Sequence, residues 1–254
     1  MAWLEPHTTG DCVVAVDAPL IVRNLSGQHQ CEWLVSKCFS RHDAGAHSSN
    51  RGMDAFRDGG RAFRLASRLG LALDPRMDDE RLGRRRIIEV YPHPALVALF
   101  DLPKCLKYKA KRGRTVSSRK AEFGRCIELL ESLDGAVPKL DLAVTKRADL
   151  KAELRLALTD RALDRAEDEL DAFVCAYIAC YYWTHGTRRC RVIGDVDYGS
   201  RLWPFIRLSS RFGGDSSVRE GNLDAAAAEV DHRDQRVGGV EAVGAVGEQP
   251  DLAV

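Results

Sequence analysis

The chain has 254 residues, which is enough for one large domain or for a domain with an appendage. Its composition is that of a globular protein, with 45% hydrophobic and 30% charged residues. The formal net charge of +1 excludes a strong overall field of the kind that attracts nucleic acids, although residues 81–125 are basic and the last third of the chain is acidic.

The eight cysteines are scattered along the chain and form no CxxC pair. Several of them, including Cys12, Cys175 and Cys180, stand among apolar residues, as reduced cysteines of a protein core do. We therefore expect no disulfide framework and a reducing compartment, the cytoplasm. The first residues show no basic start followed by an apolar stretch, and no uncharged apolar run could span a bilayer. Neither a signal peptide nor a membrane contact is expected.

Residues 1–10 are expected to be frayed, and residues 12–20 predict the first buried strand. Four consecutive apolar residues, mostly valines, precede Asp17, and Pro19 breaks the pattern. An acid at the C-terminal end of a buried strand lies where α/β sheets bind ligands. A turn or a helix cap would explain an aspartate at this position equally well.

The next elements are a turn, a helix, a polar loop and an amphipathic helix, over residues 24–27, 28–39, 42–52 and 58–69. The amphipathic helix stops at Gly70. His42 and His47 in the polar loop are either metal ligands or members of an ordinary solvated loop.

Residues 86–91 predict a second buried strand, which Pro92 and Pro94 close. Glu89 lies inside this apolar run. Because a buried carboxylate needs a partner, either an arginine or lysine pairs with it or it faces a metal site. His93, between the two prolines, is either a packed turn histidine or a catalytic one.

A short helix over residues 94–100 is followed by a run rich in lysine and arginine over residues 104–120. Such a run is typical of a surface that faces phosphates, and also of a solvated basic loop. The sequence alone leaves both interpretations open.

Three helices are then predicted, over residues 117–133, 148–158 and 166–183. The last begins with acids and becomes almost wholly apolar, which indicates a helix buried in a larger domain. At 3.6 residues per turn, one face carries Asp164, Asp168, Asp171 and Cys175. Acids suit the first turn of a helix, but Asp171 lies a turn inside, where burial of a carboxylate requires a nearby cation.

A short strand over residues 190–193 and a turn over residues 194–199 end the patterned part of the chain. Residues 201–254 form an atypical tail that we expect to be largely disordered. From residue 219 onward the tail has no aromatic residue and little periodicity, so it cannot bury enough apolar surface to offset the entropy lost on ordering. An isolated alanine-rich helix near residues 224–230 is the alternative there.

The chain contains, in this order, VVAVDAPL at 13–20, CE at 31–32, AGAH at 44–47, IEVYPHPALVALF at 88–100, LKYKAKRGR at 106–114 and EDELDAFVCAY at 167–177. Together these phrases resemble the domain-of-unknown-function 429 family, a family of predicted nucleases with an RNase H-like fold. The resemblance implies an α/β fold in which helices flank an RNase H-like sheet, as one domain over residues 11–200.

The resemblance also implies a site. The residues on the family's acidic positions, as catalytic residues and ligands of Mg²⁺ or Mn²⁺, are Asp17, Glu89, Asp168 and Asp171. Hard carboxylate oxygens suit these cations better than zinc. Two such ions, about 3.5–4 Å apart, would activate a water and stabilise the leaving oxygen of a phosphodiester. The basic run would then face a nucleic-acid backbone through Lys107, Lys109, Lys111, Arg112 and Arg114.

The chain departs from the family pattern in several places. The family's fold opens with a β-hairpin whose first strand carries an essential aspartate, and no such hairpin precedes Asp17. His29 stands where an arginine is expected before the Cys31–Glu32 pair. The sequence after Gly199 lacks the expected short apolar strand that ends in proline. We therefore expect an incomplete domain, from a reading frame that starts late and is shifted near its end.

The function predicted on this basis is a metal-dependent nuclease or phosphodiesterase, and whether this truncated form is active stays open. The alternatives are a non-catalytic nucleic-acid-binding module and a degenerate gene fragment. Salt-dependent binding without turnover would distinguish the binding module from the enzyme.

Overall fold

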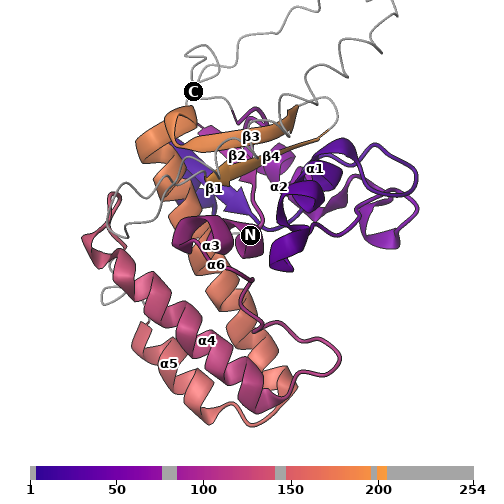
Figure 1. Cartoon of the computed structure of the whole chain (residues 1–254). Coiled ribbons are helices and arrows are strands. Elements are labelled where there is room, and N and C mark those ends of the chain that lie inside the picture. Colours follow the sequence, from indigo (N-terminus) through magenta and orange to yellow (C-terminus); the bar gives the residue numbers. More distant parts are fainter. Residues whose placement is uncertain (1–3, 76–84, 141–146, 196–198, 205–254) are drawn as a thin grey trace, which may run out of the picture. The chain divides into compact units, whose positions relative to one another are not determined.

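The computed structural model describes residues 4–75, 85–140, 147–195 and 199–204 (Figure 1). All of them belong to one compact unit, Met1–Ser209. Within these ranges the chain forms six α-helices and four β-strands, so the α/β class expected from the sequence is confirmed. None of the described helices is long and apolar enough to cross a membrane.

Each helix predicted from hydrophobic periodicity is present, with its ends shifted by a few residues. The helices are α1 (Gln30–Phe39), α2 (Gly60–Leu69), α3 (Pro92–Phe100), α4 (Val116–Glu131), α5 (Arg147–Leu156) and α6 (Asp160–His185). The strands are β1 (Cys12–Val16), β2 (Arg85–Glu89), β3 (Cys190–Asp195) and β4 (Gly199–Pro204).

Strands β1 and β2 pair in parallel, in a register that sets Val16 opposite Glu89. Both strands were predicted from their continuous apolar runs, which are typical of strands buried on two faces. The second strand is shorter than predicted because Pro92 already begins α3, where its fixed φ and missing N–H are tolerated in the first turn.

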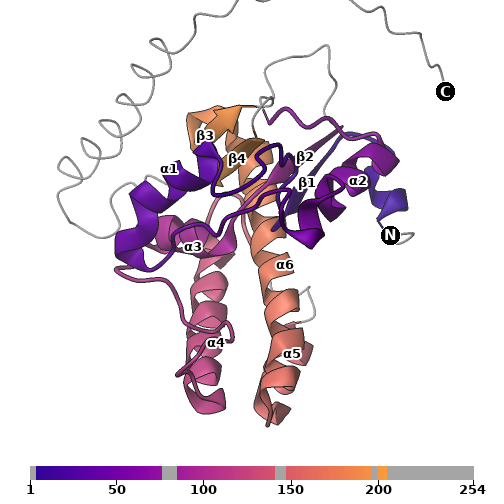
Figure 2. The same ribbon diagram turned by 90° about the vertical axis from the view of Figure 1, so that its right-hand side faces the viewer.

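Helix α2 lies on one side of β1 and β2, and α3 lies on the other (Figure 2). Successive residues of the two strands pack toward different helices. The even-numbered residues of β1, with Ile87 of β2, contribute to a small core that α2 completes. Val13 and Ala15, with Ile88, pack instead against the main core, to which α3, α4 and α6 contribute. This alternation follows from the two-residue period of a strand, and it decides on which side of the strands each acid lies.

Helix α6 begins at Asp160 rather than near residue 166. The side chain of Thr159 caps it by accepting a hydrogen bond from the N–H of Ala162 (3.3 Å). Asp168 and Asp171 therefore lie well inside the helix, where the dipole of its N-terminus no longer stabilises a carboxylate. Their charges need partners from other parts of the fold.

The remaining strands form an antiparallel pair in which Cys190 lies opposite Pro204. In the described part of the chain the four strands thus form two two-stranded sheets. Residues 201–204, which we placed in the tail, belong to β4, and the rest of the tail lies outside the described residues. In the segment expected to be frayed, Glu5–Thr8 forms a 3-10 helix whose Thr8 is buried.

Candidate functional site

Two of the predicted acids meet at one cationic side chain. Asp17 directly follows β1, and α6 packs along β1 and carries Asp171. Residues 101–115, the connection between α3 and α4 that we call the basic loop, supply Lys109. Its Nζ atom lies 2.6 Å from Asp171 Oδ2 and 3.6 Å from Asp17 Oδ2. Lys109 is therefore the cation that the buried position of Asp171 required.

The carboxylate of Asp171 is held from both of its oxygens by consecutive residues of the basic loop. The hydroxyl of Tyr108 donates to Oδ1 at 2.7 Å, while the ammonium of Lys109 donates to Oδ2. Tyr108 is completely buried, and Asp171 is 8% exposed. A carboxylate that receives such hydrogen bonds is both stabilised in its charged form and fixed in orientation.

The site determines the protonation of its neighbours. Burial acts to lower the pKa of Lys109, but the carboxylates of Asp171 and Asp17 outweigh it and raise the pKa to about 12. Burial, and then the charge of Asp171, raises the pKa of Tyr108 well above its usual value. Burial and the two aspartates likewise raise the pKa of Cys175 to about 12. At neutral pH these groups are a cation, a neutral phenol and a neutral thiol, so none of them is poised as a general base.

Glu89 lies on the other side of the strands. It is the register partner of Val16, which packs toward α2, whereas Asp17 turns to Lys109. The side chain of Glu89 is buried, and its Oε2 atom accepts a hydrogen bond from the backbone N–H of Leu20 (3.0 Å). This hydrogen bond to a backbone amide ties the segment after Asp17 to β2.

Asp168 is exposed on α6, one turn before Asp171. Three other acids of this helix bind a residue that the sequence pattern did not single out, the completely buried Arg119 of α4. Arg119 donates to the carboxylates of Asp160 (2.7 Å), Asp164 (2.8 Å) and Glu167 (3.2 Å), and to the carbonyl of Tyr108 (2.8 Å). We call these residues the Arg119 cluster.

A signal for this cluster was present in the sequence. Arg119 precedes Phe123 by one helical turn and so stands on the apolar stripe of α4. A charged residue on a buried stripe predicts acids facing it from another element. The cluster joins α4, α6 and the basic loop, and it anchors the backbone of Tyr108 beside the site.

No group of three or more histidine, cysteine, aspartate or glutamate side chains within the described ranges is arranged to hold a metal ion. Asp17 and Asp171 nevertheless both reach one cation, the Lys109 ammonium. Mg²⁺ keeps several waters and is commonly bound through one or two carboxylates together with substrate phosphates. The pair of aspartates fits this mode of binding, with either Mg²⁺ or Mn²⁺ in place of the ammonium.

The histidines of the polar loop do not assemble a further site. His42 Nδ1 lies 3.0 Å from the carbonyl oxygen of Pro103, and Arg41 donates to its Nε2 atom (2.9 Å). His47 is exposed. His42 therefore connects the loop after α1 to the basic loop, as an ordinary structural histidine does.

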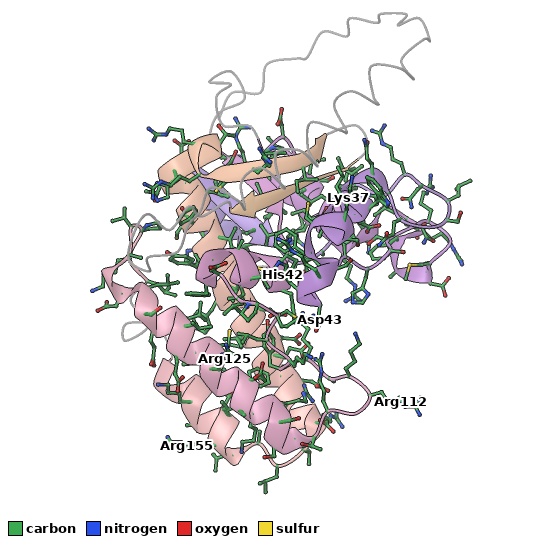
Figure 3. The ribbon with its side chains drawn as sticks, viewed as in Figure 1. Lys37, His42, Asp43, Arg112, Arg125 and Arg155 are labelled. Carbon is green, nitrogen blue, oxygen red and sulfur yellow. The ribbon has the colours of Figure 1, made fainter. Side chains whose placement is uncertain are left out.

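The basic loop presents its charges in different ways. Lys111 and Arg112 are exposed, and Figure 3 shows Arg112 at the outer end of the loop, directed away from the ribbon. The ammonium of Lys107 lies 3.5 Å from Asp43, and Arg114 donates to the carbonyl of Lys109 (2.8 Å). Lys111 and Arg112 thus face solvent, whereas Lys109 is turned to the acids.

The sequence profile of a family described as a protein of unknown function, DUF429, matches residues 1–196. No curated protein and no solved structure matches the chain. The matched segment contains Asp17, Lys109 and Asp171, together with all of the described chain up to residue 195. Since the match covers well over half of the chain, this protein belongs to the DUF429 family.

Proposed function

We propose that the chain is a metal-dependent nuclease or phosphodiesterase whose Mg²⁺ or Mn²⁺ ion is held by Asp17 and Asp171. The observation that carries this proposal is the convergence of these two carboxylates on one cationic atom, Lys109 Nζ, at the base of a loop rich in lysine and arginine. When bound, such an ion activates a water and neutralises charge on the leaving oxygen of a phosphodiester.

The chain's own residues would position the components of this reaction. Tyr108 holds Asp171 in one orientation through its hydroxyl. Lys111 and Arg112 would bind phosphates of the substrate through charge. Asp168, exposed one turn before Asp171, is the second acid of this helix that falls on the family's acidic positions.

Glu89 would act as a positioning residue, because its hydrogen bond to Leu20 N holds the segment that follows Asp17. The family's acidic pattern also assigns Glu89 as a metal ligand.

The compartment we propose is a reducing one such as the cytoplasm, because the cysteines are free rather than paired in disulfides. The free cysteines are Cys12, Cys31, Cys38, Cys105, Cys126, Cys175, Cys180 and Cys190.

A non-catalytic nucleic-acid-binding module is the second candidate. It is favoured by the same ion pair, because Lys109 already neutralises part of the charge that a divalent cation would need. In that case the exposed basic residues would bind phosphates without cleavage.

The test combines cleavage and binding. Fluorescently labelled single- and double-stranded DNA and RNA are incubated with wild type, Asp171→Asn and the control Asp54→Asn, in Mn²⁺, in Mg²⁺ and in EDTA. Asp54 is an exposed acid outside the site. We expect cation-dependent cleavage that Asp171→Asn abolishes and Asp54→Asn retains. Salt-sensitive binding without cleavage would favour the binding module, and absence of both would refute the proposal.

A further inference from the structure

The acid pair already contains a positive charge of its own. Lys109 Nζ contacts carboxylate oxygens of both Asp171 and Asp17, which are the atoms that a divalent cation would use. A cation bound by both carboxylates would take the position between them that the ammonium now occupies. Two cations at that one position would repel each other strongly. Cation binding at the pair therefore requires the ammonium to leave.

The two residues that hold Asp171 differ in how readily they can leave. Tyr108 is completely buried and donates through a neutral hydroxyl. The side chain of Lys109 is 29% exposed, and that of Asp17 is 33% exposed, so the ammonium has a path to solvent. Tyr108 can thus keep Asp171 in place while Lys109 exchanges.

The backbone of Lys109 is anchored independently of its side chain. Arg114 donates to the carbonyl oxygen of Lys109 at 2.8 Å, and the carbonyl of the preceding Tyr108 accepts from Arg119. Displacement therefore needs a change of side-chain rotamers and no refolding of the basic loop. The freed ammonium would join Lys111 and Arg112, which belong to the same loop.

We infer that Lys109 is a resident counter-ion of the acid pair: a divalent cation displaces it, and the displaced ammonium then binds a phosphate of the nucleic acid. This inference rests on the proposed function and describes regulation of the same site. Both the cation and the nucleic acid favour the state in which the Lys109 ammonium has left the acid pair. The two ligands therefore bind cooperatively, and each raises the affinity for the other by the same factor. The ammonium neutralises the acids until a divalent cation replaces it.

The first test is calorimetric titration of Mn²⁺, without nucleic acid, into wild type, Lys109→Met and Lys139→Met. Methionine retains a long apolar stem, and Lys139 is an exposed lysine outside the site that serves as the matched control. We expect Lys109→Met to bind Mn²⁺ about ten-fold more tightly than wild type, within the range of typical couplings between sites. Lys139→Met should stay close to wild type.

The outcomes separate the two proposals. Wild type that binds Mn²⁺, with Lys109→Met of equal or weaker affinity, overturns the counter-ion role and leaves the metal site intact. Absence of binding in folded wild type and in both variants refutes the proposed metal site itself. Lys109→Gln, which keeps a hydrogen-bond donor but no charge, replaces the methionine variant if circular dichroism shows that the latter is unfolded.

The second test addresses the release of the ammonium. Binding of a phosphorothioate single-stranded oligonucleotide is measured by fluorescence anisotropy at several salt concentrations, with and without Mn²⁺. One additional phosphate contact steepens the logarithmic salt dependence by about 0.7 for a single strand. We expect this increase on addition of Mn²⁺ in wild type and not in Lys109→Met. Equal changes of slope in the two proteins would overturn the release step.

Discussion

Replacing Arg119 by methionine removes the cation that links α4 to α6 and keeps a side chain of similar length. Arg119 is completely buried, and it donates to the carbonyl of Tyr108 and to the carboxylates of Asp160, Asp164 and Glu167. We expect the free energy of unfolding to fall by about 3 kcal/mol, because removal of one partner leaves buried polar groups without their donor.

The magnitude follows from how exposed each partner is. Loss of one member of a buried ion pair costs about 3–5 kcal/mol. The side chains of Asp160 and Asp164 are 62% and 53% exposed, so water replaces the lost contacts at little cost. The cost arises mainly at the buried carbonyl of Tyr108 and at Glu167, whose side chain is 18% exposed. This places the expected loss at the lower end of the range.

The assay is urea unfolding at neutral pH, followed by far-UV circular dichroism. Arg125→Met, which changes an exposed arginine of the same helix (Figure 3), serves as the control and should alter stability by no more than about 0.5 kcal/mol. A loss smaller than about 1 kcal/mol for Arg119→Met, within the ordinary range of surface and partly buried changes, would refute the reasoning.

Two further predictions concern residues beside the acid pair. Tyr108→Phe removes the hydroxyl that donates to Asp171 at 2.7 Å, so the free energy of unfolding should fall by about 1.5–3 kcal/mol, as measured by urea unfolding. An unchanged stability would show that this hydrogen bond does not form. Burial, together with the charges of Lys109 and Arg114, lowers the pKa of His93 to about 3, so the native state keeps this histidine neutral where the unfolded chain binds a proton. Stability should therefore fall as the pH drops below about 6.5, by about 2 kcal/mol at pH 5. His93→Gln should show a smaller fall, and an identical pH dependence in both proteins would contradict the assignment.

Local patterns were sufficient to predict most of the elements. The apolar runs before Asp17 and before Pro92 predicted two buried strands, because a parallel strand covered on both faces needs apolar residues at successive positions. Gly70 correctly marked the end of α2, since it adopts a φ of 60° that other residues disfavour. Such features depend on a few neighbouring residues, and the sequence displays them directly.

Helix α6 begins at Asp160, whereas the change from charged to apolar residues predicted a start at residue 166. The buried positions Leu163, Ala166 and Leu170 already show helical spacing on both sides of that point. With the earlier start, Glu167, Asp168 and Glu169 also lie inside the helix and not in its first turn. The need for cations from other elements then becomes a firm expectation, although their identity does not.

The sequence by itself determined the α/β class, the family, the position of Asp17 at a strand end and the requirement of Asp171 for a positive partner. Only the tertiary structure decided that this partner is Lys109 and that Glu89 lies on the opposite side of the strands. The physical reason is that hydrophobic periodicity indicates which positions are buried, including those that carry a charge. The partner that neutralises each charge depends on how α6 packs on β1 and on the course of the basic loop, and these long-range contacts have no local signature.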